Sequence, residues 1–269
     1  MRRIAQFVSN YMIEPPVLAT HAPALASPRC EEMFVAHGMN YPGAPEGGWA
    51  WYIRRTYASS KKHLSIVMPP LPIPYGTHHT KMFVLVYADG GVRVVVHSAN
   101  LISVDLENKA QVAWHQDFAP KRPGAASTSA FEHDLVSYLR TLEMHRAGAG
   151  GESVEPWRRF LDNVVACDYA CAKATLVTSV PGYHRGKDMD LYGHMKIRRV
   201  LAQHAFPAKF KQAPICCQYS SLGSLTSNVS ASCVHPPAQA PTQPPNQPTI
   251  AHPPASYLSH LIPRFLSRN

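Results

Sequence analysis

Three polar residues of this chain, His79, Lys81 and Asn100, are of types that could act together on a phosphodiester. The negative charge of a phosphodiester repels nucleophiles, so its cleavage depends mainly on positioning and charge neutralisation. Lys81 offers a positive charge, and Asn100 offers a neutral hydrogen-bond donor. A neutral imidazole can itself attack phosphorus, because the ordinary histidine pKa of about 6.5 leaves most of the ring unprotonated at neutral pH. We therefore predict that His79 is a nucleophile.

A simpler interpretation gives these residues no catalytic role. The pattern His-x-Lys before a strand arises by chance, polar side chains are common at a solvated strand end, and Asn100 suits a turn. The catalytic interpretation therefore depends on whether the chain brings the three residues together.

Two apolar runs lie between the His-x-Lys pattern and Asn100. Residues 82–87 (MFVLVY) and 92–96 (VRVVV) have the length and the β-branched content of buried strands. Residues 88–91 between them read Ala-Asp-Gly-Gly, and Asp-Gly and Gly-Gly supply the positive φ values that short hairpin loops require. The sequence therefore predicts an antiparallel hairpin.

The hairpin loop also predicts how the two strands pair. If Tyr87 faces Val92, each facing pair has residue numbers that sum to 179. This pairing places Lys81 opposite Ser98, and His79 opposite Asn100. Because side chains two apart on a strand share a face, the imidazole, the ammonium and the carboxamide are expected to converge near one end of the hairpin.

At these residues the chain resembles a known family. Residues 76–82 (GTHHTKM) and 97–101 (HSANL) resemble the first H-x-K…N motif of the tyrosyl-DNA phosphodiesterases, a eukaryotic branch of the phospholipase D superfamily. Further blocks agree in the same order: 9–12 (SNYM), 35–38 (VAHG), 114–118 (WHQDF), 131–135 (FEHDL), 192–194 (YGH) and 219–225 (YSSLGSL). The resemblance extends from about residue 5 to residue 225.

The resemblance implies a DNA repair reaction. His79 would attack the phosphorus at a single-stranded or nicked DNA 3′ end and displace a tyrosyl peptide, the remnant of a stalled topoisomerase. Lys81 and Asn100 would hold the nonbridging oxygens, and hydrolysis of the phosphohistidine would release a 3′-phosphate. The family's location implies a nuclear protein, with an organelle as the alternative.

The resemblance also implies contacts to DNA. Tyr75, just before the motif, would stack on a base, or would instead cap the apolar face of the hairpin. Ser98 lies inside the motif and is a further candidate. Ser221 and Ser224 match a family segment that touches the DNA backbone, and a plain turn is the competing interpretation.

Family members carry two H-x-K…N motifs that face one phosphate, and this sequence shows one. Its other H-x-K, at residues 194–196, lies among apolar residues at helical spacing, so we predict an amphipathic helix there. Three hypotheses follow: an enzyme whose chain is shortened at both ends, a half-site completed by homodimerisation, or a DNA-end-binding remnant without turnover. We favour the first, because the sequence changes abruptly to Pro-rich after Leu225.

Composition supports a polyanionic partner only weakly. The formal net charge is +9, but many basic proteins bind no nucleic acid. The six cysteines form no C-x-x-C pair and the 15 histidines are scattered, and phosphohistidine chemistry requires no metal, so we predict no metal or other cofactor. We also find no apolar run long enough for a membrane span and no convincing signal peptide.

The order of elements predicts an α/β fold, and the resemblance specifies a phospholipase D-like mixed β-sheet sandwiched between helices. Predicted strands are 4–7, 33–36, 64–67, 82–87, 92–97, 110–114 and 174–178, and predicted helices are 130–141, 156–164 and 193–203. We expect a nearly complete first repeat at 1–172, the opening of a truncated second repeat at 173–225, and a disordered Pro-rich tail at 226–269.

Overall fold

The computed structural model describes residues 2–38, 48–73, 76–125, 129–144, 154–210 and 213. These residues divide into two compact units. The first contains the described residues up to Leu176 together with Val180–Gly182, and the second contains Val177–Ser179 and the described residues from Tyr183 onward. The expected tail at 226–269 lies outside the described residues. The domain boundaries that we derived from the sequence stay predictions.

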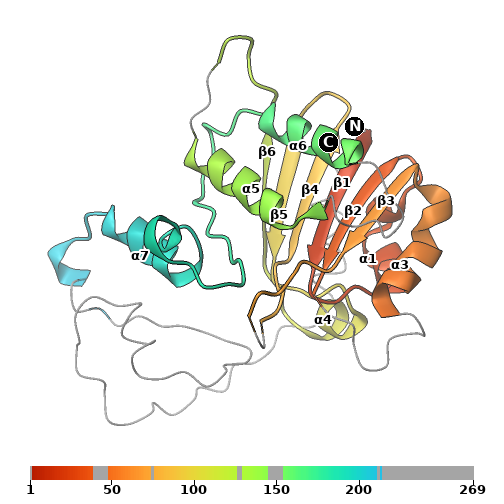
Figure 1. Ribbon diagram of the computed structural model, residues 1–269, viewed down its shortest axis with the longest axis horizontal. Helices are drawn as coiled ribbons and strands as arrows, with labels where there is room; N and C mark the ends of the chain where they lie inside the picture. Colours follow the sequence, from red (N-terminus) through yellow and green to blue (C-terminus); the bar gives the residue numbers. More distant parts are fainter. Residues whose placement is uncertain are drawn as a thin grey trace, which may run out of the picture. The chain divides into compact units, whose positions relative to one another are not determined.

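A six-stranded mixed sheet forms the centre of the first unit (Figure 1). Its strands are β1 (Arg3–Asn10), β2 (Glu32–His37), β3 (His63–Val67), β4 (Met82–Tyr87), β5 (Val92–His97) and β6 (Ala113–Phe118). The spatial order is β3-β2-β1-β4-β5-β6, with β1, β2 and β3 parallel to one another and the pairs from β1–β4 to β5–β6 antiparallel. The predicted fold class is confirmed.

Helices cover both faces of this sheet, because side chains alternate across each strand and both sets are apolar. One face packs Phe7, Val84 and Val94 against α5 (Ala130–Thr141) and α6 (Glu155–Val165). The opposite face packs under four helices: α1 (Pro15–His21), α2 (Pro23–Ala26), α3 (Gly48–Tyr57) and α4 (Ser103–Asn108). A short 3₁₀ turn, Ala58–Ser60, follows α3.

The described residues of the second unit form one longer helix, α7 (Gly193–Ala202), and two 3₁₀ turns, Gly186–Asp188 and Ala208–Phe210. The second H-x-K lies within α7, which confirms that it is helical. The predicted strand at 174–178 is wrong, because the structure assigns no strand there. The carbonyl of Thr178 accepts a hydrogen bond from the backbone N–H of Gly193 at 2.8 Å, so this segment bonds to the start of a helix and not to a sheet.

The predicted boundaries of β4, β5 and α5 are those of the structure, and those of β1, β2, β3, α6 and α7 differ by one to three residues. Strand β6 was placed too early by three to four residues. Its sequence, AWHQDF, is only partly buried because β6 is an edge strand, so the apolar pattern that marks the other strands is weak here. Helices α1 to α4 were not predicted.

The pairing that we predicted for the hairpin is wrong by one residue. Met82 faces Val96 and Val86 faces Val92, so the residue numbers of facing pairs sum to 178. The cause is a three-residue loop, which Gly90 closes with a φ of 81° while its N–H donates to the carbonyl of Tyr87. A left-handed residue at the end of a type I turn is the usual geometry for such a loop.

Candidate active site

The structure places His79 and Lys81 in direct contact. Lys81 Nζ lies 2.8 Å from Nδ1 and 3.5 Å from Nε2 of His79, and 3.1 Å from the His79 carbonyl oxygen. The imidazole is exposed, whereas Lys81 is only 7% exposed. The two side chains share one face because the segment is extended, and Thr80 between them directs its carbonyl to β1. An accessible ring is thus paired with a largely buried ammonium.

Strand β1 anchors the H-x-K segment through one hydroxyl. Ser9 Oγ donates to the carbonyl of Thr80 at 2.9 Å and lies 2.8 Å from His78 Nε2. Since the hydroxyl proton goes to Thr80, His78 Nε2 must carry the hydrogen of the second bond. Burial lowers the pKa of His78 to about 4, and the nearby charges of His37, His79 and Lys81 act in the same direction. His78 is therefore a neutral structural donor at neutral pH.

A close backbone approach fixes the same segment from β2. Gly38 follows β2, and a Cβ atom there would overlap the carbonyl oxygen of His78 and lie 2.6 Å from Tyr11 Cδ2. The N–H of Gly38 also donates to the carbonyl of Tyr11 at 3.1 Å. Only glycine leaves room for this approach. Gly38 thereby allows the ends of β1 and β2 to pack directly against the backbone of His78.

Asn100 is held by a carboxylate and not by the hairpin ladder. Because the pairing is shifted, Lys81 faces His97, whose N–H donates to the Lys81 carbonyl at 3.1 Å, and the ladder ends there. Asp105 Oδ2 accepts from Asn100 Nδ2 at 2.8 Å and from its backbone N–H at 2.9 Å. Among the described residues, the buried Asn100 Oδ1 has no hydrogen-bond partner.

The loop that carries Asn100 is fastened to the segment after β1. Asn10 Nδ2 donates to the carbonyl of Ala99 at 3.1 Å. The backbone N–H of Leu101 donates to the carbonyl of Met12 at 3.0 Å, and the N–H of Glu14 donates to the carbonyl of Leu101 at 2.8 Å. Residues 9–12 (SNYM) therefore join the H-x-K segment to the loop of Asn100. The resemblance singled out this block without assigning it that task.

Electrostatics keep the site mostly in a lysine-charged, histidine-neutral state. Burial lowers the pKa of Lys81 to about 8, and the negative charge of Asp105 opposes this shift. Partial burial also lowers the pKa of His79, because part of its ring is removed from water; the charge of Lys81 lowers this pKa further, and the charge of Asp105 raises it. Asp105 thus acts on both groups while it holds Asn100, which connects the three predicted residues.

Two residues of this site were missed by the sequence reasoning. The ring of Tyr11 lies 4.7 Å from that of His79 at an interplanar angle of 36°. Asp105 lies in α4, and Lys109 also bonds its Oδ1 at 2.6 Å. Burial raises the pKa of Asp105, but the bonds from Lys109 and Asn100 outweigh it and leave the pKa below its ordinary value. The SNYM block contains Tyr11 and could have indicated it, whereas no motif in the sequence indicated Asp105.

Of the remaining predicted site residues, the structure describes only Ser98, which does not contact this cluster. The Ser98 hydroxyl is exposed and donates to Gln111 Oε1 at 2.6 Å, while it accepts from the N–H of Val112 at 2.9 Å, so it serves a turn before β6. Tyr75, Ser221 and Ser224 lie outside the described residues, and their roles stay predictions.

Within the described ranges, no cluster of three or more His, Cys, Asp or Glu side chains is arranged to hold a metal ion. In the same part of the chain, no helix has the length and apolarity that crossing a membrane would take.

Comparisons with known proteins agree with the motif. A family model described as tyrosyl-DNA phosphodiesterase matches residues 2–239. Tyrosyl-DNA phosphodiesterase 1 of Arabidopsis thaliana is 39% identical over 229 residues, which are 82% of this chain and 35% of that protein. The Drosophila melanogaster protein of the same name is 34% identical over 179 residues, which are 64% of this chain and 29% of that protein. The chain thus spans about a third of the length of these curated relatives.

A solved structure shows the same fold. The crystal structure of yeast tyrosyl-DNA phosphodiesterase superposes with a TM-score of 0.53 at 17% sequence identity. The match covers 75% of this chain and 43% of the yeast chain.

Proposed function

The chain belongs to the tyrosyl-DNA phosphodiesterase family, and we propose that it supplies the nucleophilic half of a phosphodiesterase site, with His79 as the nucleophile. The contact between His79 and Lys81 at 2.8 Å is the observation that carries this proposal. Lys81 and Asn100 bind the nonbridging oxygens of a phosphodiester, and Tyr11 and Asp105 position the groups that react.

The same contact indicates how substrate activates the ring. With Lys81 protonated, its N–H points to Nδ1 of His79, so this nitrogen holds the lone pair of the neutral ring. A phosphate oxygen competes for the ammonium as an acceptor with full negative character. When Lys81 moves to that oxygen, the ring nitrogen is released and can attack. Substrate binding and exposure of the nucleophile are then one event.

The reaction is a substitution at phosphorus. The released nitrogen of His79 forms a bond to phosphorus, and the bond from phosphorus to the tyrosine oxygen breaks. The leaving oxygen takes a proton from a general acid, and water then attacks the phosphohistidine to give a 3′-phosphate and free His79. General acid–base catalysis contributes about 10²–10⁴ in rate. Of the two H-x-K patterns in the sequence, the second lies in α7 and does not offer this acid in a strand-end geometry.

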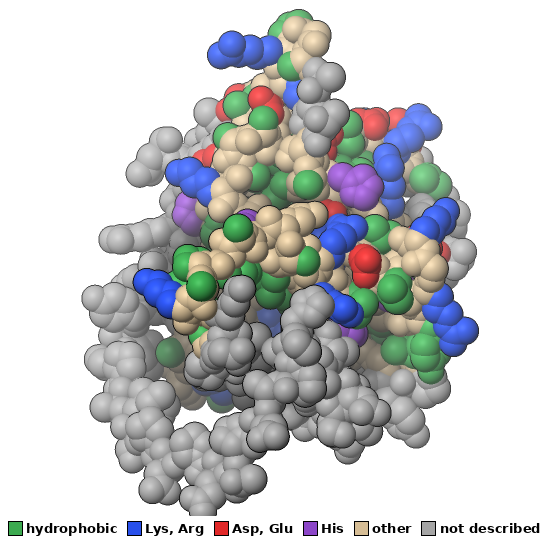
Figure 2. Space-filling model, turned by 90° about the vertical axis from the view of Figure 1, so that its left-hand side faces the viewer, with side chains coloured by type: hydrophobic (Ala, Val, Ile, Leu, Met, Phe, Trp, Pro, Cys, Tyr) green, Lys and Arg blue, Asp and Glu red, His purple; other side chains and the backbone are tan. Residues whose placement is uncertain are grey.

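The substrate that we propose is a DNA 3′ end, single-stranded or nicked, that carries a tyrosyl peptide. Support comes from family membership and from the net charge of +9. On the face shown in Figure 2, basic side chains stand at several separate places and not in one patch. Recognition would therefore depend on phosphate binding at His79 and Lys81 more than on a broad basic surface. A nuclear location is part of the same proposal.

A substrate whose leaving group departs without taking up a proton needs no general acid, so it tests the nucleophile by itself. The full chain is incubated with an oligonucleotide that ends in a 3′-(4-nitrophenyl) phosphate, and a covalent protein–DNA species is sought on a denaturing gel. We expect an adduct with the unsubstituted chain, and none with His79→Ala. His133→Ala, which removes an exposed imidazole on α5, is the matched control and should form the adduct normally. An adduct of equal yield in His79→Ala would refute the assignment.

The natural 3′-phosphotyrosyl end then separates the hypotheses. Adduct formation with nitrophenyl but not tyrosyl ends indicates a half-site that lacks its acid. Tyrosine release that rises with the square of protein concentration indicates that two copies share one phosphate. Salt-sensitive binding of 3′ ends that survives His79→Ala, with no adduct on either substrate, indicates a binding protein without turnover.

A further inference from the structure

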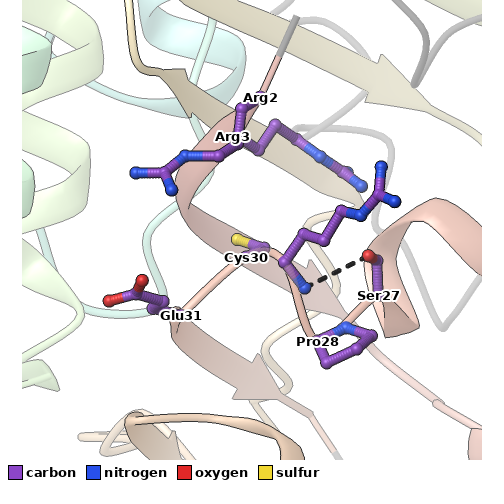
Figure 3. Close-up of a pocket in the computed structure, with 7 residues that line it drawn as sticks. Arg2, Arg3, Ser27, Pro28, Cys30 and Glu31 are labelled. Atoms are coloured by element: carbon purple, nitrogen blue, oxygen red, sulfur yellow. Dashed lines mark hydrogen bonds between the residues drawn. The ribbon is translucent and has the colours of Figure 1, made fainter.

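A second basic site lies at the other end of β1. There the structure contains a cavity of about 660 Å³ between the start of β1 and the turn that leads into β2. Three arginines line it, Arg2, Arg3 and Arg29, together with the remaining residues of the segment 27–31 (Figure 3). We call this cavity the arginine pocket. Seven strand steps separate Arg3 from Asn10, so the pocket lies roughly 23 Å from the His79 end of the sheet.

A β-bulge aims Arg3 at the pocket. Arg3 faces Tyr87 and Ala5 faces Val86, so one extra residue stands in β1 between these pairs. The bulge turns Arg3 to the face that carries α2, where its Nη2 donates to the carbonyl of Ala24. Arg3 is only 9% exposed, and among the described residues its Nη1 has no hydrogen-bond partner. The structure thus buries a guanidinium with part of its donor capacity unused.

Lys61 adds a second buried cation behind the same turn. Its Nζ donates to the carbonyls of Ser27 at 2.6 Å and Cys30 at 3.0 Å, and the residue is 7% exposed. Burial lowers the pKa of Lys61, and the charge of Arg3 lowers it further. Burial likewise lowers the pKa of Arg3. Both cations therefore lose hydration, and neither pairs with a carboxylate in the part of the chain that the structure describes.

The carboxylates near the pocket are engaged with other cations. Glu31, which lines the pocket, pairs with Lys62 at 3.2 Å. Glu32 pairs with Arg159 at 2.7 Å. Burying a charge without a counterion costs free energy, and an anionic ligand that pairs with the charge would reduce this cost.

We propose that the arginine pocket binds a phosphate group. Arg2 and Arg29 are exposed and can close on its oxygens, with Arg3 supplying the buried charge. Guanidinium is the side chain that best matches phosphate, because its planar N–H fork can bond two oxygens at once. The ligand is either free inorganic phosphate or a backbone phosphate of a nucleic acid. The proposal does not depend on the role given to His79.

Thermal unfolding of the full chain in sodium phosphate, compared with sodium chloride of equal ionic strength, tests the site. A ligand that binds the folded state raises Tm, and we expect phosphate to raise it by a few degrees. The shift should fall at least twofold when Arg2→Ala and Arg29→Ala are combined. The matched control combines Arg122→Ala and Arg140→Ala, two exposed arginines of the same unit, and should keep the full shift. Because Arg3 is buried, its removal would also disturb folding, so it is not the residue substituted.

Phosphate could also reach Lys81, so the titration is repeated with Lys81→Ala. In Lys81→Ala, the part of the phosphate-induced rise in Tm that depends on Arg2 and Arg29 should persist. An equal phosphate shift in the Arg2/Arg29 variant and the unsubstituted chain, or no shift beyond that of chloride, overturns the proposal.

A labelled single-stranded oligonucleotide then identifies the source of the phosphate. If a backbone phosphate occupies the pocket, the Arg2/Arg29 variant binds the oligonucleotide more weakly and its salt dependence falls by about 0.7 in log–log slope. If free phosphate is the ligand, oligonucleotide affinity matches that of the Arg122/Arg140 control.

Discussion

At the scale of single residues, Lys81 determines what His79 can do. The ammonium occupies the ring nitrogen that holds the lone pair, and its charge lowers the pKa of the ring. In the proposed mechanism the imidazole is therefore deprotonated but blocked until an anion draws Lys81 away. This arrangement would protect the proposed nucleophile from electrophiles that carry no anionic group, since these do not compete for an ammonium.

The two pKa shifts predict a bell-shaped pH dependence for adduct formation. The rate should rise as pH increases through the pKa of His79, which lies below the ordinary value, because the neutral ring is the proposed nucleophile. It should fall above about pH 8, where Lys81 loses its proton. Single-turnover rates with the nitrophenyl substrate measure both limbs. Lys81→Arg stays protonated over this pH range, so the decrease in rate above about pH 8 should disappear, although the maximal rate is lower. If the decrease remains unchanged, a group other than Lys81 causes it.

Asp105 allows a charge effect to be separated from a hydrogen-bond effect. In Asp105→Asn the side-chain oxygen can still accept from Asn100, but the negative charge that raises the pKa of Lys81 is gone. We expect the upper limb of the pH profile to move to lower pH while the plateau rate changes less. Asp134→Asn, on α5, is the control. A large loss of plateau rate with no shift of the limb would show that Asp105 acts through geometry alone.

At the scale of elements, three strand ends and one loop converge to make the site. The ends of β1 and β2 and the start of β4 meet at Ser9, Gly38 and His78, and the loop before α4 is fastened to the segment after β1. Each contact joins segments that lie far apart in the chain. The position of His79 therefore depends on tight backbone approaches as well as on its own side chain.

Gly38 is the sharpest test of this convergence. In Gly38→Ala the new methyl group would overlap the His78 carbonyl, so β2 and the H-x-K segment must separate. Overpacking of this kind lowers the free energy of unfolding by about 1–3 kcal/mol. We expect the rate of adduct formation to fall by a larger factor than the loss of folded protein explains. Urea unfolding and adduct rates measure the two effects. In Gly124→Ala the methyl group meets nothing within 4 Å, so only backbone strain at φ 80° should appear and the adduct rate should stay normal.

At the scale of the whole first unit, the sheet carries excess positive charge at both ends. One end holds Lys81 and Lys109 around a single buried carboxylate, that of Asp105. The other end holds Arg3 and Lys61, and among the described residues no buried carboxylate pairs with either of them. Binding of anions at either end would therefore also stabilise the fold.

Acid should destabilise this unit well above the pH at which carboxylates titrate. Burial lowers the pKa of His78 to about 4 and that of His97 to about 3, against an ordinary value of 6.5. The folded state then binds fewer protons than the unfolded state, so the contribution is complete above pH 6.5 and is lost as pH falls toward 4. The loss for His78 alone is on the order of 3 kcal/mol. Urea unfolding at pH 7.5 and 4.5 measures it, and His78→Gln should show a smaller difference.

The sequence by itself determined the family, the mixed α/β class, the hairpin strands and the proximity of His79 to Lys81. The resemblance of its sequence motifs identified the family. The other features depend on local patterns: an apolar run, a glycine loop, and alternation along an extended segment, which puts residues two apart on one side. Strand β6 was misplaced, and helices α1 to α4 were not predicted, because their patterns are short or polar and tertiary packing stabilises them.

Only the tertiary structure decided how Asn100 reaches the site and which way Arg3 points. Loop composition allowed either of two hairpin pairings, and the observed one leaves Asn100 to be placed by Asp105 and by the segment after β1. The bulge beside Arg3 likewise depends on the pairing of β1 with β4. Both outcomes follow from hydrogen bonds between segments distant in the chain, whose geometry no local pattern of residue types contains.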